Sequence, residues 1–142
     1  MPGAFDISAS ALYAQRVRMD SIAENLANAN TTHGVDGKIA PYRRKFVIFE
    51  TGDPATGNPT EGVHVSEIRS DMTAAFRREF DPNNEDAVKD PTSHDFGYVL
   101  YPNVNPLVEM INMIDATRAY EMNATAIEAT KTMGQATDRI LA

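Results

Sequence analysis

Apolar side chains near the start of the chain recur at helical spacing. Four of them lie seven residues apart: Phe5, Leu12, Met19 and Leu26. Ile22 and Ala29 follow the last two by three residues, so a helix would gather all six on one narrow face. We therefore predict an amphipathic helix over residues 7–30, with Asp6 as its N-cap.

A second amphipathic pattern occupies the end of the chain. Asn105 followed by Pro106 is typical of an N-cap with proline at the first helical position, where its missing N–H costs nothing. A row of residues seven apart follows: Met113, Tyr120 and Ile127. A second row parallel to it includes Met133. A helix to about Ile140 would be roughly 50 Å long. That is too long for its apolar face to be covered by the N-terminal helix alone, so we expect part of the face to contact other molecules.

Residues 33–103 carry a different pattern, with frequent Gly and Pro turn signals. Four short runs have strand character: residues 43–50, 63–68, 75–80 and 97–101. The acidic stretch 81–95 between the last two is predicted to be an exposed loop. The sequence thus predicts an α+β, mainly α, fold in which long N- and C-terminal helices pack as a coiled-coil-like pair around a small antiparallel β-rich insertion. The corresponding divisions are 1–32, 33–103 and 104–142.

Composition then narrows the function. A net charge of −7 disfavours nucleic acid as a partner, and the absence of cysteine excludes disulfides and thiolate metal sites. Arg16, Arg18 and Asp20 interrupt the first apolar segment, and no apolar run is long enough to cross a bilayer. We therefore expect neither a cleaved secretion signal nor direct membrane insertion. No hydrolase, nucleotide-binding or zinc-protease motif occurs, so we predict no catalytic residues and no cofactor.

Two candidate metal sites fail on ligand spacing. Alternate positions of the acidic loop carry oxygen ligands, as in an EF-hand: Asp81, Asn83 and Glu85. Asp86, however, stands where that loop needs glycine, and Thr92 stands where it needs a bidentate glutamate. The three histidines are isolated in or near turn regions: His33, His64 and His94. None has a second ligand at helical spacing, so we predict no bound metal.

Two features allow alternative interpretations. The chain has one basic cluster: Lys38, Arg43, Arg44 and Lys45. It is either a charged strand edge that discourages aggregation or a docking patch for an acidic surface, such as the 81–95 loop of a neighbouring subunit. The rows of the C-terminal helix are either a core or an assembly seam, and the excess length of that helix favours the seam.

The exit of the first helix carries a family resemblance. The run Asn25-Leu26-Ala27-Asn28-Ala29-Asn30-Thr31 is similar to the N-terminal signature of the rod and hook proteins that form the axis of the bacterial flagellum. Further similar blocks follow: Pro41-Tyr42-Arg43-Arg44-Lys45 with Phe49, Phe80-Asp81-Pro82, Gly97-Tyr98-Val99, Tyr101-Pro102-Asn103-Val104-Asn105, Glu109-Met110-Ile111-Asn112-Met113-Ile114, and Arg118-Ala119-Tyr120-Glu121 with Asn123. The resemblance spans nearly the whole chain, and residues 83–96 depart from the family pattern as an extended passage.

This resemblance implies a structural, non-enzymatic subunit of the proximal rod in the flagellar basal body. Such subunits are exported to the periplasm by the flagellar type III apparatus and polymerise helically through their terminal helices. The product would be a torque-transmitting shaft that also walls the export channel. Implied partners are copies of the chain, other rod proteins, an adaptor at the rod base, the MS ring and the export apparatus. The alternatives are another short proximal rod protein or, from a different class, a soluble acidic binding or metal-dependent helical module.

The resemblance and the apolar rows together nominate an assembly interface. Its predicted residues are Leu12, Met19, Ile22, Asn25, Leu26, Asn28, Thr31, Arg43, Arg44, Met113, Tyr120, Ile127 and Met133. For Asn25, Asn28 and Thr31 two roles stay open. Their short polar side chains either stop the helix locally or bridge to an adjacent subunit.

Overall fold

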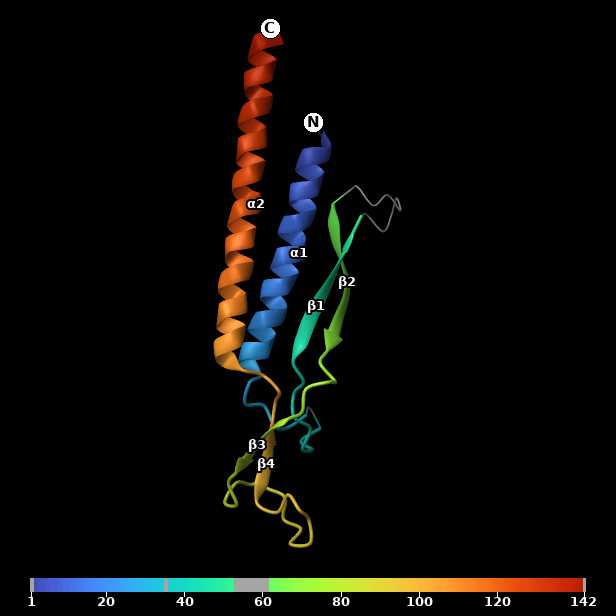
Figure 1. Ribbon diagram of the computed structural model, residues 1–142, viewed down its shortest axis with the longest axis vertical. Helices are drawn as coiled ribbons and strands as arrows, with labels where there is room; N and C mark the ends of the chain where they lie inside the picture. Colours follow the sequence, from blue (N-terminus) through green and yellow to red (C-terminus); the bar gives the residue numbers. More distant parts are fainter. Residues whose placement is uncertain (1, 35, 53–61, 142) are drawn as a thin grey trace.

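The computed structural model describes residues 2–34, 36–52 and 62–141, and Figure 1 shows an elongated molecule with two long helices and two hairpins. In chain order the elements are α1 (Pro2–Ala27), β1 (Lys45–Thr51), β2 (Val63–Ser70), β3 (Arg77–Phe80), β4 (Tyr98–Tyr101) and α2 (Pro106–Leu141). The strands form two separate antiparallel pairs, β1 with β2 and β3 with β4. The predicted fold class, mainly α with a small antiparallel β insertion, is confirmed.

The two helices begin differently from one another. α1 begins at Pro2, so the prediction of Asp6 as its N-cap is wrong. Proline suits the first turn because its ring pre-sets φ, and the helix therefore starts one turn before the polar cap signal. α2 begins at Pro106 as predicted: the Asn105 side-chain oxygen accepts hydrogen bonds from Leu107 N at 3.1 Å and Val108 N at 3.5 Å.

The asparagine-rich exit ends α1 at Ala27, three residues before the predicted end. Asn28 Nδ2 donates to the Glu24 carbonyl at 2.9 Å, and Asn28 Oδ1 accepts from the Thr31 hydroxyl at 3.2 Å. These local bonds compete with continuation of the helix. Asn28 and Thr31 therefore act as a helix stop.

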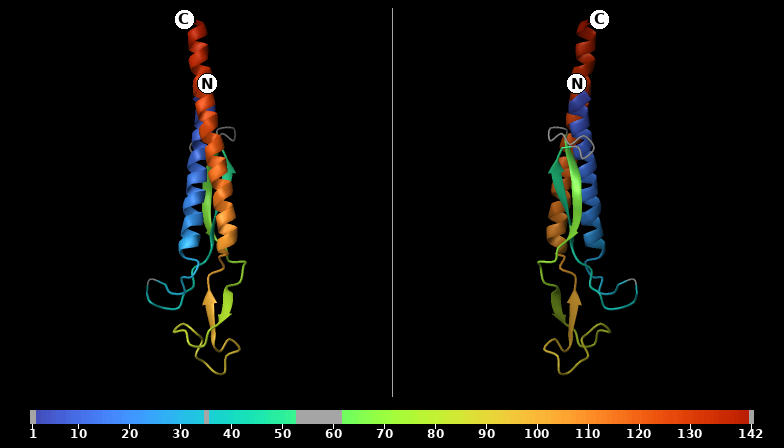
Figure 2. Two further views of the ribbon diagram at one scale, coloured as in Figure 1. Left: turned by 90° about the vertical axis from the view of Figure 1, so that its left-hand side faces the viewer. Right: turned by 90° about the vertical axis from the view of Figure 1, so that its right-hand side faces the viewer.

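α1 is the central element of the molecule. α2 runs antiparallel along one flank of α1, and the β1–β2 hairpin lies along the other, as Figures 1 and 2 show. Two contacts set the register of the helices: Asn25 Nδ2 donates to Glu109 at 3.0 Å, and the Thr117 hydroxyl lies 3.8 Å from the Met19 sulfur. The same register places Pro2 opposite about residue 133, because both helices rise about 1.5 Å per residue.

α2 consequently extends beyond the start of α1. Its 36 residues give a length of roughly 54 Å, against roughly 39 Å for the 26 residues of α1. The C-terminal end of α2 projects alone past the N-terminus in Figure 1. Its last turns therefore lack the neighbour that covers the first half of the helix.

The β1–β2 hairpin is attached to α1 near the helix start. The Ser10 hydroxyl accepts a hydrogen bond from Val63 N at 3.1 Å and donates to the Ile7 carbonyl at 2.7 Å. Gly62 has a φ of 96°, a left-handed value, and a Cβ there would collide with the Ser10 side chain. A glycine is therefore required where the hairpin approaches the helix.

The second hairpin and the 81–97 loop form the tip of the molecule, at the end opposite the two chain termini in Figure 1. The prediction of an exposed loop over residues 81–95 is wrong at Asp86 and Ala87, which are buried. Asp86 accepts a hydrogen bond from the Thr32 hydroxyl at 2.6 Å and lies 2.8 Å from His33 Nε2. The loop is thus tied to the exit of α1.

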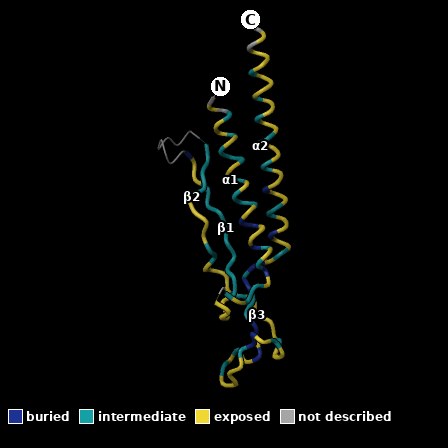
Figure 3. Tube along the Cα trace, turned by 180° about the vertical axis from the view of Figure 1, so that it is seen from behind, coloured by how far each residue is buried: buried dark blue, intermediate teal, exposed yellow. Residues whose placement is uncertain are grey.

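Few large apolar side chains are buried. Among the described residues, the buried apolar ones are Ala14, Ile22, Ala29, Ala87, Val99, Val104 and Ala116. In Figure 3 the upper part of α2 is exposed along much of its length, and buried positions gather near the lower ends of the helices and at the tip. None of the described helices combines the length and hydrophobicity needed to cross a membrane.

We expect amide hydrogen exchange in the isolated protein to follow the packing of α2. Amides around Ala116, which is fully buried, should be well protected, and protection should fall beyond Met133 because no neighbouring element covers the helix there. Mass spectrometry of exchanged peptides would measure this gradient. Uniform protection from residue 109 to 141 would contradict it.

Candidate functional site

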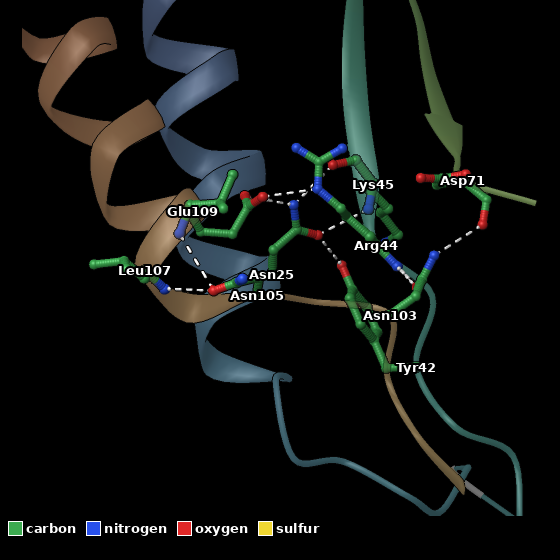
Figure 4. A network of polar contacts seen from close by, with 10 residues as sticks. Asn25, Tyr42, Arg44, Lys45, Asp71, Asn103, Asn105, Leu107 and Glu109 are labelled. Carbon is green, nitrogen blue, oxygen red and sulfur yellow. Dashed lines mark hydrogen bonds and ion pairs between the residues drawn. The ribbon is translucent and has the colours of Figure 1, made fainter. Parts of the chain in front are cut away.

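An amide at the lower end of α1 joins three segments of the chain. Asn25 Nδ2 donates to the Lys45 carbonyl at 2.7 Å and to Glu109 Oε2 at 3.0 Å, and Oδ1 accepts from Lys45 N at 2.8 Å and from the Tyr42 hydroxyl at 3.0 Å. Figure 4 shows Asn25 between the start of β1 and the first turn of α2. Both donors and both acceptor positions of the amide are therefore used. Asn25 is completely buried, so the amide has no surface left for a neighbouring subunit.

A buried carboxylate continues this network. Glu109 is completely buried, and its Oε1 accepts from Arg44 Nε at 2.7 Å. A buried carboxylate needs both a counter-charge and hydrogen bonds, and here Arg44 supplies the first and Asn25 adds to the second. Since Glu109 lies in the first turn of α2, it also interacts favourably with the positive end of the helix dipole.

Asn103 connects the strand region to the same junction. Its Oδ1 accepts from Arg44 N at 2.9 Å, and its Nδ2 donates to the Asp71 carbonyl at 3.2 Å. Asp71 N in turn donates to the Arg44 carbonyl at 2.7 Å. The segments that precede β1, follow β2 and precede α2 are therefore held together by one side chain, as Figure 4 shows.

Tyr42 and Lys45 complete the junction on its outer side. Lys45 Nζ forms an ion pair with Glu24 of α1. Burial of the Tyr42 ring, followed by the nearby carboxylates of Glu24 and Glu109, raises the pKa of Tyr42 from its ordinary value of 10.0 to about 12. The folded chain therefore favours the neutral hydroxyl that donates to Asn25.

The basic cluster is mostly engaged within the chain. Besides the pairs of Arg44 and Lys45, Arg43 Nη1 donates to the carbonyls of Asp71 at 3.1 Å and Ala74 at 3.4 Å, and its guanidinium lies 4.2 Å from the centre of the Phe76 ring. Neither open interpretation of the cluster included these internal roles. Contact of Arg43 and Arg44 with another subunit stays a prediction.

The predicted interface rows lie on or near the surface between α1 and α2. Glu109 and Ala116 mark the face of α2 turned toward α1, and helical spacing places Met113, Tyr120 and Ile127 on that same face. These three are half-buried, as are the predicted α1 residues Leu12, Met19 and Leu26. Ile22 is buried, whereas Met133 is exposed. Their contact with other subunits stays a prediction.

The exposed apolar surface of α2 is a stripe that sequence reasoning missed. Its side chains are each more than half exposed: Leu107, Ile111, Ile114 and Met122. Their spacing of four, three and eight residues puts them on one helical face, which we call the outer stripe. The apolar residues of this stripe also recur at helical spacing in the sequence, but on the face opposite the seven-residue rows. Such a stripe on a helix is typical of a contact surface.

The three histidines do not converge within the described residues. His33 lies against Asp86, His64 against Glu50 at 3.7 Å, and His94 against Asp95 at 3.8 Å. Among the residues 2–34, 36–52 and 62–141, no group of three or more His, Asp or Glu side chains is placed to hold a metal ion.

Comparison with known families identifies the class of protein. The family described as "Flagella basal body rod protein" matches residues 5–34, which cover most of α1 and its exit. The family described as "Flagellar basal body rod FlgEFG protein C-terminal" matches residues 97–140, which cover β4 and α2. The two matches include α1 and α2, two of the three elements that meet at the Asn25 junction.

Individual relatives define the family more closely. The flagellar basal-body rod protein FlgC of Bacillus subtilis (strain 168) is 43% identical over 90% of this chain and 89% of its own length. FlgC of Aquifex aeolicus (strain VF5) is 40% identical over 90% of this chain and 87% of its own length, and FlgC of Salmonella typhimurium is 39% identical over 91% and 89%. The chain belongs to the FlgC family of flagellar basal-body rod proteins. The resemblance found in the sequence is confirmed.

We expect Asn25→Ala to lower the free energy of unfolding by about 2 to 3 kcal/mol, because it removes the donor to the buried Glu109 Oε2 and the acceptor of the Tyr42 hydroxyl. Asn28→Ala is the matched control, since that amide makes only local bonds, and it should cost about 0.5 kcal/mol. Urea denaturation of the isolated protein would measure both changes. Equal losses in the two variants would contradict the assigned role of Asn25.

The raised pKa of Tyr42 predicts a loss of stability in strong alkali. Below pH 10 the hydroxyl is protonated in both states, so its contribution is complete; between pH 10 and about 12 only the unfolded chain ionises, so stability falls. Denaturation of the wild type should become easier across this window, and Tyr42→Phe should show a shallower decline. The exposed Tyr13 provides the control, because Tyr13→Phe should retain the steep decline.

Proposed function

We propose that this protein is a structural subunit of the proximal rod of the flagellar basal body and that it polymerises through its helices. The observation that carries the proposal is the outer stripe of α2, which is exposed in the single chain. Membership of the FlgC family supports the same proposal. Water exposure of four large apolar side chains is unfavourable, and burial against neighbouring subunits would relieve it.

One face of α2 would then make contacts within the subunit, and the opposite face would make contacts between subunits. The face with Glu109 and Ala116 joins α1 within the subunit, and the outer stripe joins the next subunit. Repetition of one such contact between different surfaces builds a helical assembly. Many subunits placed around an axis would form a shaft that transmits torque and encloses the export channel.

The partners follow from this assignment. We propose that the subunit contacts further copies of itself and the other rod proteins FlgB, FlgF and FlgG, with a FliE-type adaptor and the MS ring at the base. It would reach the periplasm through the flagellar export apparatus. Residues 1–32 and 104–142 would form the rod-building helical domain, and residues 33–103 would form its β-rich insertion.

The proposal requires no turnover chemistry. Two of the buried polar residues, Asn25 and Glu109, are hydrogen-bonded to one another and to Arg44, Lys45 and Tyr42. These hydrogen bonds hold α1, β1 and α2 in a fixed relative position, as a structural subunit of a shaft requires. The alternative of a metal-dependent helical module gains no support from the separated histidines of the described residues.

We expect Ile111→Asp to prevent incorporation into the rod while leaving the isolated chain folded. Ile111 is 52% exposed, so the new carboxylate is solvated in the free subunit but would have to be buried in the assembly. Motility, rod content and secreted protein should be measured in a strain that carries only this variant. Circular dichroism of the purified protein would confirm that the fold is retained.

Ala9→Asp is the matched control, because Ala9 lies on an exposed face of α1 among polar residues. It should permit assembly and swimming. Normal motility of the Ile111→Asp strain would refute the role of the outer stripe. Equal loss in the Ala9→Asp strain would show that the stripe is not specific.

A further inference from the structure

A cavity of about 330 Å³ lies where α1, β1 and α2 meet. Phe46, Val47 and Phe49 of β1 provide its apolar lining. Arg18 and Ser21 of α1 line it as well. An engineered cavity of about 150 Å³ already accommodates benzene, so this one has room for an aromatic side chain.

The polar groups of the cavity are incompletely paired. The Ser21 residue is 6% exposed, and its hydroxyl has no hydrogen-bond partner among the described residues. A buried hydroxyl without a partner is unfavourable. Arg44 also lines the cavity, and within the described residues its guanidinium is hydrogen-bonded through Nε to Glu109. Arg18 forms no ion pair with any carboxylate of the described residues 2–34, 36–52 and 62–141.

The charges therefore define the chemistry of the missing occupant. Two guanidinium groups face the cavity against a single buried carboxylate, Glu109, so an additional negative group would be attracted. The apolar lining calls for an aromatic or aliphatic side chain beside it. An occupant with a large apolar group next to carboxylates satisfies both requirements.

The tip of the same molecule carries such a group. Phe96 is 49% exposed and follows Asp95, whose carboxylate pairs with Arg78 at 2.9 Å. Two further carboxylates of the loop, Glu85 and Asp90, are exposed. In Figure 1 this loop lies at the end of the molecule opposite the two chain termini. None of its residues lines the cavity, which is formed by α1, β1 and α2.

We propose that the cavity receives Phe96 and the neighbouring carboxylates from a second copy of this chain. The contact rests on the proposed function, and it names the surfaces that two copies use. Because the donor and the acceptor are different surfaces, the contact is heterologous and leaves a free cavity at one end and a free tip at the other. It therefore propagates along a row of copies, with the Ser21 hydroxyl and the guanidinium groups of Arg18 and Arg44 bonded to the incoming carboxylates.

Cross-linking within assembled rods tests the contact, since the chain contains no cysteine. Cells would carry two differently tagged copies, one with Val47→Cys and one with Phe96→Cys, and isolated basal bodies would be treated with a short bismaleimide. We expect a cross-link between the two tagged forms. Ile48→Cys is the matched control, because Ile48 is the next residue of β1 and does not line the cavity; it should give no cross-link with Phe96→Cys.

A charge reversal provides a second measurement. Arg18→Glu should abolish the cross-link between Val47→Cys and Phe96→Cys, whereas Arg16→Glu, on the exposed face of α1, should retain it. If Val47→Cys does not assemble, Arg18→Cys takes its place as the cavity residue.

The outcomes separate the contact from the proposed function. Rods that contain the chain but yield no cross-link, or that yield it equally with Ile48→Cys, overturn the contact and leave the rod function intact. Basal bodies without the chain overturn both.

Discussion

The hydrogen bonds of one buried amide determine how the rest of this molecule is arranged. Asn25 uses all four of its bonding positions to connect the end of α1 with the start of β1 and the first turn of α2. Hydrogen bonds are directional, so they select one relative placement of the three segments. The apolar contacts are less selective, because many of the buried apolar side chains are alanines, whose flat surfaces permit helices to slide. Glu109 and Asn25 are among the largest fully buried side chains, so the junction of α1, β1 and α2 has a polar centre.

The central position of α1 explains why α1 is covered on two flanks while one face of α2 stays exposed. α1 is flanked by α2 on one side and by the β1–β2 hairpin on the other, and the residues of its seven-residue stripe are half-buried. α2 has only one covered flank, and its outer stripe stays in water. The single chain thus has a defined fold and leaves apolar surface exposed on α2. The same division accounts for the low number of large buried side chains among the described residues, since part of the apolar surface of α2 stays exposed.

Local patterns predicted the elements well and the junction poorly. The two helices, the four strands and the Asn105 cap could be predicted because spacing, turn residues and caps act over a few positions. The start of α1 was misplaced because Asp6 offered a plausible cap while the helix begins at Pro2. The partners of Asn25 could not be found in this way, because Glu109 lies 84 residues away along the chain and no spacing rule reaches that far. The blocks that carried the family resemblance include Tyr42, Arg44, Asn103 and Glu109, and their meeting point became visible only in three dimensions.

The unequal lengths of the helices have a mechanical consequence for a stack of such subunits. If α1 and α2 ended at the same level, two stacked copies would share a flat boundary crossed by side-chain contacts alone, and shear would concentrate there. In this chain α2 continues roughly 12 Å beyond the start of α1. Successive ends would therefore lie at different heights, as in staggered brickwork. Any section through the boundary would then cut at least one continuous helical backbone, and the load on a turning column would be carried across it by covalent bonds.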